Sequence, residues 1–538
     1  MATLSKMFFT ALISLNVAIA SASLQIRTGD LVCASLPAPK VPGAKVLSIT
    51  AVPRYKVPPN PLYALYDPSV ANLTVDVCDI QVTLTHPGVS DKVGVTVWLP
   101  LKGWNGRYQG AGGGGWTAGA NADISLFRPA VEGWAAGFTD GGNISDANGT
   151  VTPNILSGPG QVNLASLTNF AARGLHYVAV VGKAVAASYY GQAPKYSYWN
   201  GCSTGGRQGY MLAQKYPNDF NGIMANAPAL YWPSFMLALN WAQFLMNSLQ
   251  TYPSACEFES FQNASIKACD GLDGVKDGII SDASNCNFDP YKLIGQVIRC
   301  GQKTIKISPQ TAEIVQKIRE GPRSPLGQLW DGFDFGINYQ GIAHVATLPD
   351  GSTGPSPLGP PNDWVKWFIK KDPRFDFTTV RTLEQITDLF ATTDPVYGGI
   401  IGTDNPDLTA FRDVGGKLLT WHGVADELIM VNNTLRYRRA VESVVGGGPE
   451  VNKFYRLFLA PGVAHCSGGY GPVPFRPLDS LVDWVERDKA PETLFANFTN
   501  TAKKSVSKQL CLWPKVSLYD GIGDPNRATS YTCAEYYL

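Results

Sequence analysis

The chain has 538 residues, of which 45% are hydrophobic and 16% are charged, so it can bury a large core and is not intrinsically disordered. Its 44 Lys and Arg residues nearly balance its 43 Asp and Glu residues, and the formal net charge is +1. There is no Lys/Arg stripe, and we therefore expect no nucleic-acid partner. The length predicts several domains, or one large domain with insertions.

The first 22 residues have the pattern of a secretory signal peptide. Lys6 supplies a positive charge, residues 7–20 form an apolar run, and residues 18–20 and 20–22 are small-x-small cleavage sites. The run is shorter than the roughly 20 strongly apolar residues that a membrane helix needs. No later stretch is long and apolar enough, so we expect a secreted chain that begins near Ser21 or Ser23 and has no membrane partner.

Ten cysteines and six N-x-[ST] sequons agree with export. An even number of cysteines in an exported chain predicts up to five disulfides. A zinc site, the alternative, would need CxxC pairs, and the sequence has none. The cysteines are Cys33, Cys78, Cys202, Cys256, Cys269, Cys286, Cys300, Cys466, Cys511 and Cys533. The sequons, which predict a glycosylated surface, are at Asn72, Asn143, Asn148, Asn263, Asn432 and Asn497.

Strand and helix patterns alternate along two parts of the chain. The expected strands are at 92–100, 107–109, 196–200, 222–227, 417–421 and 453–459, and the expected helices are at 165–190 and 204–216. This alternation predicts an α/β fold with a mostly parallel sheet covered by helices.

Residues 231–404 do not keep this alternation. They hold four of the ten cysteines, an Asp/Gly-rich stretch and a Gly/Pro-rich stretch at 348–361. We interpret them as a domain inserted into the α/β core. The predicted organisation is a signal peptide (1–22), the first part of the core (23–230), the insertion (231–404) and the second part of the core (405–538).

Residues 201–205 form a G-x-S-x-G motif with Ser203 at its centre. In this motif a sharp turn from strand to helix lifts the serine hydroxyl above the sheet, and small flanking residues permit the strained backbone. The alternative is an ordinary Gly-rich helix N-terminus. Because a strand pattern precedes the motif and a helix pattern follows it directly, the sequence favours Ser203 as a nucleophile.

A nucleophilic serine needs a histidine base and an acid, which follow it in the order acid, histidine in α/β-hydrolases. His465 lies in a turn-rich loop after a strand near the end of the core, where we expect the base. We expect structural roles for the other histidines, which are His86, His176, His344 and His422.

Asp426, in the loop after strand 417–421, is the predicted acid. Its competitors are Glu427 and Asp413. Glu427 would point elsewhere if Asp426 faces His465, and Asp413 precedes the strand, at the wrong end of a parallel sheet.

The oxyanion of the tetrahedral intermediate needs preorganised N–H donors. We expect one from Thr204, at the start of the helix after Ser203. The second is expected from Gly113 or Gly114 in the glycine run 112–115, because glycine lets the backbone approach a substrate closely. A flexible linker is the alternative interpretation of this run.

The segment 269–279 combines three carboxylates with interleaved glycines. Asp270, Asp273 and Asp277 can wrap a hard cation, and the carbonyls of Val275 and Ile279 would complete the coordination, which predicts a structural Ca²⁺ site. The spacing is not that of an EF-hand. An ordinary solvated turn is the alternative, although three carboxylates so close together would repel one another.

Several motifs together resemble the tannase and feruloyl esterase family. They are Gly-Cys202-Ser203-Thr-Gly-Gly-Arg, the Trp-His-Gly before Asp426, the pair His465-Cys466, the run Cys269-Asp-Gly-Leu-Asp-Gly-Val-Lys-Asp-Gly-Ile-Ile, and Arg-Tyr-Gln-Gly-Ala-Gly112-Gly-Gly-Gly-Trp. The resemblance covers nearly the whole chain after the signal. One departure is Gly113, which stands where many members carry Asn.

The resemblance implies an α/β-hydrolase core with a large inserted lid domain that binds calcium. By this resemblance, Asp270, Asp273 and Asp277 bind the ion by side chain, and Val275 and Ile279 bind it by backbone. The implied disulfides are Cys33–Cys78, Cys202–Cys466, Cys269–Cys286 and Cys511–Cys533, which leaves Cys256–Cys300 as the remaining pair.

These observations predict a secreted serine esterase that releases aromatic acids through an acyl-enzyme. Feruloyl and other hydroxycinnamoyl esters of plant cell-wall material are the first choice of substrate, and galloyl esters, the substrates of tannases, are the second. A secreted peptidase with the same triad and a calcium-dependent binding protein without activity are the alternative classes. The aromatic residues of the insertion could set specificity or belong to the core; they are Tyr231, Trp232, Trp364 and Trp367.

Overall fold

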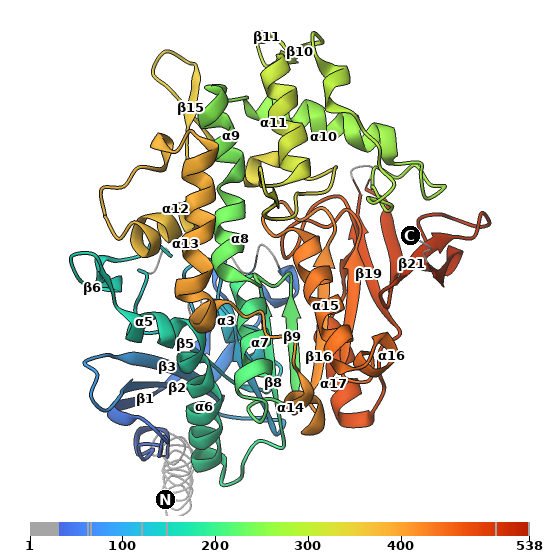
Figure 1. Ribbon diagram of the computed structural model, residues 1–538. Coiled ribbons are helices and arrows are strands. Elements are labelled where there is room, and N and C mark those ends of the chain that lie inside the picture. Colours follow the sequence, from blue (N-terminus) through green and yellow to red (C-terminus); the bar gives the residue numbers. More distant parts are fainter. Residues whose placement is uncertain are drawn as a thin grey trace, which may run out of the picture. The chain divides into compact units, whose positions relative to one another are not determined.

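The computed structural model describes residues 32–61, 64, 67–119, 122–146, 149–500 and 503–535. The predicted signal peptide (1–22) and the sequon at Asn148 lie outside these residues. The chain forms two compact units (Figure 1). Unit 1 takes in Met1–Ala111, Ala120–Asp140 and Tyr177–Ser197, and unit 2 takes in Gly112–Gly119, Gly141–His176 and Tyr198–Leu538.

Unit 1 is built on five strands in the order β1-β2-β3-β5-β4. They are β1 (Lys45–Val57), β2 (Val75–Thr85), β3 (Val93–Pro100), β4 (Arg107–Ala111) and β5 (Ala135–Thr139). Alternate β-branched residues of β3 point into the core, which is the pattern of a strand with one buried face. The unit also holds α3 (Ala122–Ser125), α4 (Phe127–Val131) and most of α6 (Gly174–Tyr190).

The strands of unit 1 do not follow the predicted parallel arrangement. β1 pairs with β2, β2 with β3, and β3 with β5 in antiparallel fashion, and only β4 and β5 pair in parallel. The expectation of a mostly parallel sheet is therefore wrong for this unit. Short connections such as residues 86–92, between β2 and β3, lead directly into antiparallel neighbours, whereas parallel neighbours need a long crossover.

Unit 2 is built on four parallel strands in the order β8-β9-β16-β17. They are β8 (Tyr196–Cys202, of which 198–202 belong to this unit), β9 (Gly222–Asn226), β16 (Lys417–Gly423) and β17 (Tyr455–Ala460). The near-continuous burial of β9, β16 and β17 is typical of strands covered on both faces. The predicted strands and the predicted helix after Ser203 are confirmed here.

Helices accompany these strands, whose parallel pairing places their carboxyl ends at one edge of the sheet. α7 (Thr204–Lys215) connects β8 to β9, and α15 (Val431–Val445) and α16 (Gly448–Val451) connect β16 to β17. α5 (Leu164–Thr168) precedes β8, α14 (Thr409–Asp413) precedes β16, and α17 (Pro477–Arg487) follows β17. In such a sheet, ligands bind outside the carboxyl ends of the strands. Ser203 and the loops with Asp426 and His465 directly follow β8, β16 and β17.

Residues 231–404 fold mainly as helices within unit 2, drawn in green to orange in Figure 1. The helices are α8 (Trp232–Leu239), α9 (Trp241–Leu249), α10 (Ala255–Cys269), α11 (Pro309–Glu320), α12 (Gly359–Asp363) and α13 (Leu383–Ile401). Short strand pairs accompany them, β10 (Val297–Cys300) with β11 (Lys303–Lys306), β12 (Arg323–Ser324) with β13 (Gly327–Gln328), and β14 (Val345–Thr347) with β15 (Thr353–Pro355). Capping boxes at Ser254 and Thr382 begin α10 and α13.

The remaining strands of unit 2 form small antiparallel sheets. They are β6 (Leu156–Gly158) with β7 (Gln161–Val162), β18 (Val473–Pro474) with β19 (Thr493–Thr499) and β20 (Ser505–Cys511), and β21 (Lys515–Tyr519) with β22 (Tyr531–Glu535). In the described part of the chain, no helix combines the length and apolar character needed to cross a bilayer.

Each of the five disulfides lies within one of the two units. They are Cys33–Cys78, Cys202–Cys466, Cys256–Cys300, Cys269–Cys286 and Cys511–Cys533, which are the four pairings that the family resemblance implies and the fifth pair, Cys256–Cys300, that was left by elimination. The Cys202–Cys466 bridge closes the longest loop, with a sequence separation of 264 residues. It joins the end of β8 to the loop after β17.

Candidate active site

Ser203 occupies a strained turn between β8 and α7. Its backbone has φ +64° and ψ −125°, a conformation that non-glycine residues rarely adopt. A Cβ atom at Gly201 would lie 2.5 Å from the carbonyl carbon of Gly205, so the turn needs glycine at position 201. The Ser203 N–H donates to the carbonyl of Asn226, at the end of β9, at 3.1 Å. The turn is therefore held by the neighbouring strand.

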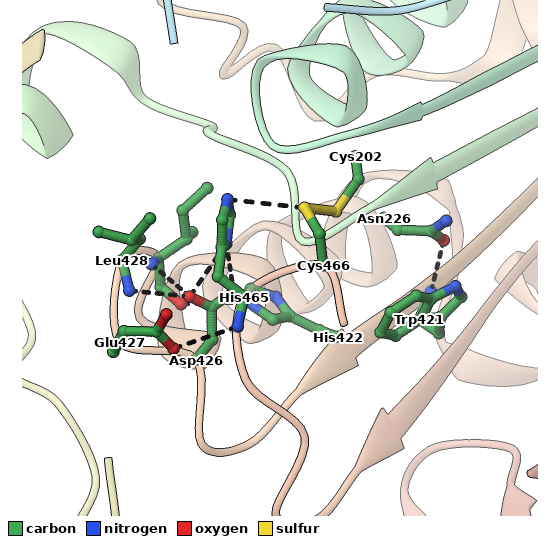
Figure 2. Close-up of a disulfide and its surroundings, with 10 residues drawn as sticks. Cys202, Asn226, Trp421, His422, Asp426, Glu427, Leu428, His465 and Cys466 are labelled. Atoms are coloured by element: carbon green, nitrogen blue, oxygen red, sulfur yellow. Dashed lines mark hydrogen bonds and ion pairs between the residues drawn. A yellow bond between two sulfur atoms is a disulfide. The ribbon is translucent and has the colours of Figure 1, made fainter. Parts of the chain in front are cut away.

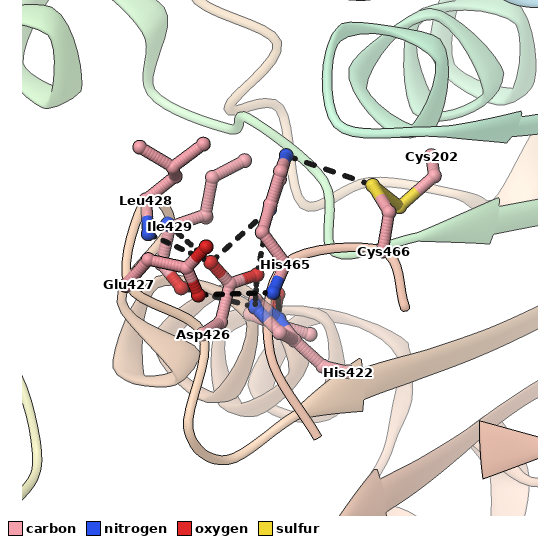
Figure 3. Close-up of polar contacts among 9 residues, drawn as sticks. Cys202, His422, Asp426, Glu427, Leu428, Ile429, His465 and Cys466 are labelled. Carbon is pink, nitrogen blue, oxygen red and sulfur yellow. Dashed lines mark hydrogen bonds and ion pairs between the residues drawn. A yellow bond between two sulfur atoms is a disulfide. The ribbon is translucent and has the colours of Figure 1, made fainter. Parts of the chain in front are cut away.

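Asp426 and His465 form a direct pair (Figures 2 and 3). The His465 Nδ1 atom lies 2.9 Å and 3.1 Å from the two carboxylate oxygens of Asp426. The loops that carry them are joined by backbone hydrogen bonds from Val424 to Ala460 and from Ala425 to Val463, at 2.9 Å and 3.0 Å. The acid and the base are thus held together by main-chain bonds as well as by their side chains.

The Asp426 carboxylate is fully buried and accepts hydrogen bonds on both oxygens. The N–H groups of Leu428 and Ile429 donate to Oδ1 at 2.9 Å and 2.8 Å, and His422 contacts Oδ2 at 3.2 Å. Burial alone would raise the pKa of Asp426. The charge of His465 and the hydrogen bonds from His422 and His465 outweigh it and hold this pKa well below its usual range, so Asp426 is ionised at neutral pH.

His422 is a second histidine on the same carboxylate. Its Nε2 lies between two acceptors, Asp426 Oδ2 and the carbonyl of Ile429, at 3.2 Å and 3.1 Å, so Nε2 must carry a proton. Its Nδ1 lies 2.8 Å from the hydroxyl of Thr434, which can donate to it. These contacts use both ring nitrogens of His422, which Figure 3 shows beside Asp426. The predicted structural role of His422 is therefore a hydrogen bond to the acid itself.

His465 is held at both its backbone and its ring. Its N–H donates to the Glu427 carboxylate at 3.2 Å, and its Nε2 lies 3.5 Å from the Cys466 sulfur. Burial lowers the pKa of His465, but the charge of Asp426, the hydrogen bond that His465 donates to it, and the charge of Glu427 raise this pKa overall above its usual value of 6.5. Glu427 contacts the backbone rather than the ring, so it does not compete with Asp426.

Ser203 and His465 line the same cavity, which has a volume of about 430 Å³. Within the described residues, no hydrogen bond joins Ser203 Oγ to His465 Nε2. A base and a nucleophile often come to full hydrogen-bonding distance only in the substrate complex. The Cys202–Cys466 disulfide links the two residues next to them, with the Cα atoms 5.9 Å apart.

The glycine loop lies against the turn that carries Ser203. The Gly205 N–H donates to the carbonyl of Gly113 at 2.9 Å, and the Thr204 hydroxyl donates to the carbonyl of Gly115 at 2.7 Å. A Cβ atom at Gly112 would lie 2.5 Å from the Cα of Gly205. The loop is therefore a packed part of unit 2, and the alternative of a flexible linker is wrong.

The predicted oxyanion donors differ in what their N–H groups contact. Thr204 is the first residue of α7, so its N–H has no acceptor within the helix. The N–H of Gly113 donates to the Gln208 side chain at 3.1 Å, and that of Gly114 is 3.3 Å from the Thr117 hydroxyl. Gly114 is exposed and its bond is long, so its N–H is the more available of the two glycine donors.

The aromatic candidates of the insertion do not line the cavity, and three of them, Trp232, Trp364 and Trp367, belong to the core, whereas Tyr231 is half-buried. Trp116 stacks on Trp364 and Phe368 and meets the edge of Trp232, and its indole N–H donates to the carbonyl of Pro360 at 3.1 Å. Trp232 and Trp364 are fully buried. Tyr231 and Trp367 are not among the residues that line the cavity over Ser203.

The acidic loop 270–279 binds mainly to its own backbone and to Lys508. Asp270 Oδ1 accepts N–H bonds from residues 277–279 at 2.8–3.2 Å, and Asp277 Oδ2 lies 2.9 Å from the Lys508 ammonium. Burial raises the pKa of Asp273, because it removes water from around the carboxylate. Across the residues that the structure describes, no three Asp, Glu, His or Cys side chains converge as a metal site.

Three contacts at the site could not be assigned from the sequence. They are the hydrogen bond from His422 to the acid, the bond between Glu427 and the backbone of His465, and the bond between Gln208 and the glycine loop. The only available signal was position, since His422 and Glu427 flank Asp426 within the same short segment and Gln208 lies one turn into α7.

A serine on a strained strand-to-helix turn, a histidine paired with a buried carboxylate, and a glycine loop around one cavity are the arrangement of a serine hydrolase. The family model described as tannase and feruloyl esterase matches residues 78–534, and the chain belongs to this family. The chain is accordingly a carboxylic ester hydrolase.

Similar proteins are known at the level of both sequence and structure. A probable feruloyl esterase from Arthroderma benhamiae is 45% identical over 522 residues, 96% of this chain and 95% of that protein. Tannin acyl hydrolase from Aspergillus niger matches the fold with a TM-score of 0.82 at 25% identity, over 94% of this chain and 95% of that one. Feruloyl esterase B from Aspergillus oryzae gives a TM-score of 0.77 at 26% identity, over 94% and 100%.

Proposed function

We propose that the protein is a secreted esterase that releases aromatic acids from feruloyl and related hydroxycinnamoyl esters of plant cell-wall material through an acyl-enzyme. Its nucleophile is Ser203, its base His465 and its acid Asp426, on an α/β-hydrolase core. The observation that carries the proposal is the pairing of His465 with a buried, ionised Asp426 beside a serine on a strained turn. The relative at 45% identity, named a probable feruloyl esterase, supports the choice of acid.

Acylation begins when Ser203 Oγ bonds to the ester carbonyl carbon and His465 Nε2 takes the hydroxyl proton. Asp426 stabilises the imidazolium that forms, because its negative charge lies against Nδ1. The N–H groups of Thr204 and the glycine loop, with Gly114 ahead of Gly113, donate to the oxyanion. When the tetrahedral intermediate collapses, the alcohol leaves with the proton from His465.

Deacylation repeats the same proton transfers with water. His465 takes a proton from the water as its oxygen bonds to the acyl carbon, and then returns a proton to Ser203 Oγ as the carboxylic acid leaves. The acyl group passes from ester to serine to water without any redox change. No cofactor takes part in either half of this cycle.

The direct test is the variant Ser203→Ala, with Ser443→Ala, an exposed serine on α15, as the matched control. Hydrolysis of methyl ferulate should fall by at least about 10³-fold in the first variant, since the residual rate comes from binding and the oxyanion hole alone. The control should keep the wild-type rate. Wild-type rates in a folded Ser203→Ala protein would refute the mechanism.

Two further assays separate the alternative classes. A fluorophosphonate probe should label Ser203 in the wild-type protein, whereas a binding protein without activity would stay unlabelled. Unfolded casein should remain uncut, whereas a peptidase with the same triad would degrade it.

Secretion is supported by the five disulfides, which form in oxidising compartments. Of the predicted glycosylation sites, Asn72, Asn143, Asn263 and Asn497 are exposed and Asn432 is half-buried. Mass spectrometry of protein secreted by a eukaryotic host should find glycans at exposed sequons and a mature N-terminus near Ser21 or Ser23. An intact residue 1–20 segment in the secreted protein would refute the signal peptide.

We further propose that residues 231–404 form a lid domain and that the loop 270–279 binds structural Ca²⁺. The donors would be the Asp270, Asp273 and Asp277 side chains and the Val275 and Ile279 carbonyls, all hard oxygen ligands of the kind Ca²⁺ prefers. The closeness of three carboxylates in one short loop supports a cation there, because without one they would repel one another. Because Lys508 already pairs with Asp277, the ion would share that carboxylate with the ammonium.

Metal removal tests the calcium proposal. Ca²⁺ that binds only the folded protein raises stability by RT ln(1 + [L]/Kd), so chelation should lower the Tm and added Ca²⁺ should restore it. Asp273→Asn should abolish the response, and Asp282→Asn, which removes a nearby half-buried carboxylate outside the donor set, should keep it. A Tm that is the same with Ca²⁺ and with chelator would refute the site.

A further inference from the structure

Two phenylalanines are exposed at the surface of unit 2, and they are neighbours. Phe475 is 58% exposed and Phe495 is 43% exposed, whereas every other phenylalanine in the described part of the chain is buried or half-buried. The Phe475 N–H donates to the carbonyl of Phe495 at 2.8 Å. Adjacent apolar side chains at a surface often mark a contact with another group.

Phe495 and Asn497 lie on the same, outer face of β19. Side chains two residues apart in a strand share one face and are separated by about 7 Å along the strand. The burial pattern agrees, because the two residues that alternate with them, Leu494 and Ala496, are buried. Asn497 begins the sequon at residues 497–499, one of the sites at which we expect an N-linked glycan.

The register of β18 places Phe475 beside the same asparagine. Val473 pairs with Asn497 in antiparallel fashion, and Phe475 follows two residues later, where its N–H reaches Phe495. Asn497 and Phe475 are thus diagonal neighbours, roughly 7–8 Å apart, a distance that a large side group can span. On the other side of Asn497 its partner is Ser507 of β20, a small residue that leaves room above the sheet.

An N-linked glycan at Asn497 would carry a sugar ring to these phenylalanines. Its first N-acetylglucosamine is bonded to the side-chain nitrogen, so the ring begins where the asparagine side chain ends. One face of such a sugar presents mainly C–H groups, and the negative face of an aromatic ring attracts their slightly positive hydrogens. The sugar hydroxyls stay in water, so the contact removes apolar surface from water without burying an unpaired polar group.

We propose that Phe475 and Phe495 form a docking surface for the first N-acetylglucosamine of a glycan on Asn497, and that this contact stabilises the folded protein. The contact requires export through a compartment that glycosylates proteins, which is part of the proposed function, and it is independent of the esterase activity. The glycan is favoured over other occupants because it is tethered to the same face of the same strand as Phe495.

Hydroxyl-radical footprinting of the protein secreted by a eukaryotic host tests the contact directly. Oxidation of Phe475 and Phe495 should be about twofold slower in the glycosylated protein than in Asn497→Gln, since a sugar ring covers one of the two faces of an aromatic ring. The matched control is Asn263→Gln, at a sequon on α10 whose neighbours one turn away include no aromatic residue, and it should leave both oxidation rates unchanged. Equal oxidation in glycosylated protein and Asn497→Gln would overturn the inference. So would an unmodified Asn497 in a chain that mass spectrometry finds glycosylated elsewhere.

A double-mutant cycle tests whether the contact stabilises the fold. It compares the wild type, Asn497→Gln, Phe495→Thr and the double variant, so that the effects of the substitutions themselves cancel. Threonine suits an exposed strand position and has no ring. Loss of the glycan should lower the Tm by about 1–3 °C beside Phe495 and by less than half as much beside Phe495→Thr. Phe495→Tyr keeps an aromatic face and should keep the full loss. Equal losses with and without the ring would show that the glycan gains nothing from Phe495 and would overturn the proposed stabilisation.

The esterase assay keeps this inference separate from the proposed function. Neither phenylalanine lines the cavity over Ser203, so Phe495→Thr should hydrolyse methyl ferulate at the wild-type rate. If the wild-type protein cleaves no ester, the esterase proposal fails, and the footprinting and the cycle still decide whether the glycan contacts the two rings.

Two further measurements examine the other occupants that an exposed aromatic pair could have. The glycosylated protein should sediment with the same mass as Phe475→Ser, and it should bind insoluble plant cell-wall polysaccharide no better than that variant does. A dimer that Phe475→Ser dissociates would assign the pair to a second copy of the chain. Retention on the polysaccharide that Phe475→Ser abolishes would assign it to an external glycan. Either result would overturn the inference.

Discussion

Removal of the Cys202–Cys466 disulfide should damage catalysis more than it damages the fold. The bridge joins the residues next to Ser203 and His465 and holds the Cα atoms of the two cysteines 5.9 Å apart. Without it, Ser203 is still held by Asn226, and His465 by Asp426 and Glu427, but no covalent bond sets the distance between the two groups. Misplacement of reacting groups by about 1 Å can cost on the order of 100-fold in rate.

The effect on stability can be estimated from loop length. In the chain-entropy model, closing a loop of 264 residues contributes about 5–6 kcal/mol, and a loop of 44 residues, that of Cys256–Cys300, contributes about 4 kcal/mol. The second disulfide lies in the 231–404 segment, away from the residues that line the cavity. It is therefore a control that makes a similar contribution to stability and lies outside the active site.

The experiment compares Cys202→Ala/Cys466→Ala with Cys256→Ala/Cys300→Ala. Both double variants should unfold at lower Tm, by comparable amounts. Below both transitions, kcat for a 4-nitrophenyl ester should fall about 10- to 100-fold in the first variant and remain within about twofold in the second. Full kcat in a folded first variant, or an equal loss in both, would refute the reasoning.

Three other predictions concern the acid and the base. Because neutral His465 is the base and its pKa is raised, kcat/KM should fall with decreasing pH along a limb that lies above pH 6.5, and a limb below 6.5 in a pH–rate profile would contradict this. The same pair makes the stability of the fold depend on pH in two opposite ways, which a plot of Tm against pH should show. The contribution of His465 is full below pH 6.5 and is lost as pH rises through its folded pKa, whereas that of Asp426 is present above pH 3.8 and is lost as pH falls through its folded pKa. His422→Leu should lower kcat with little change in KM and move the acidic limb to higher pH, because Asp426 loses a hydrogen-bond donor and its charge then acts more strongly on His465. His422→Gln can still donate, so it should restore most of kcat and most of the wild-type position of the limb. Equal pH–rate profiles for the two variants would exclude a positioning role for His422.

The parts of the site that the sequence predicts are those fixed by local backbone chemistry. Gly201 indicates the turn at Ser203 because a side chain at this position would overlap the backbone of Gly205. Asp426 and His465 could be chosen because each directly follows a strand, and the carboxyl ends of parallel strands share one edge.

The remaining contacts depend on how distant segments meet. Whether Gly113 or Gly114 can serve an oxyanion depends on the direction of each peptide N–H, which is fixed by Gln208 and Thr117. Of the antiparallel strands of unit 1, the sequence predicted β3 but not β1, which is largely exposed and has no clear alternation of apolar and polar residues. The second histidine on Asp426 follows from the curl of the loop after β16, which no spacing rule encodes.

The close packing of glycine against glycine around Ser203 limits which positions can mutate when the substrate specificity of such an enzyme changes. Backbone atoms of the loop and the turn touch where side chains would stand, so almost any mutation at Gly112, Gly201 or Gly205 is expected to be lethal to activity. The cavity walls, by contrast, come from side chains of α8 and of the start of α12, which can be exchanged without moving the reacting groups. Natural variation and directed evolution are therefore expected to explore new acids through the walls, while the chemistry stays constant.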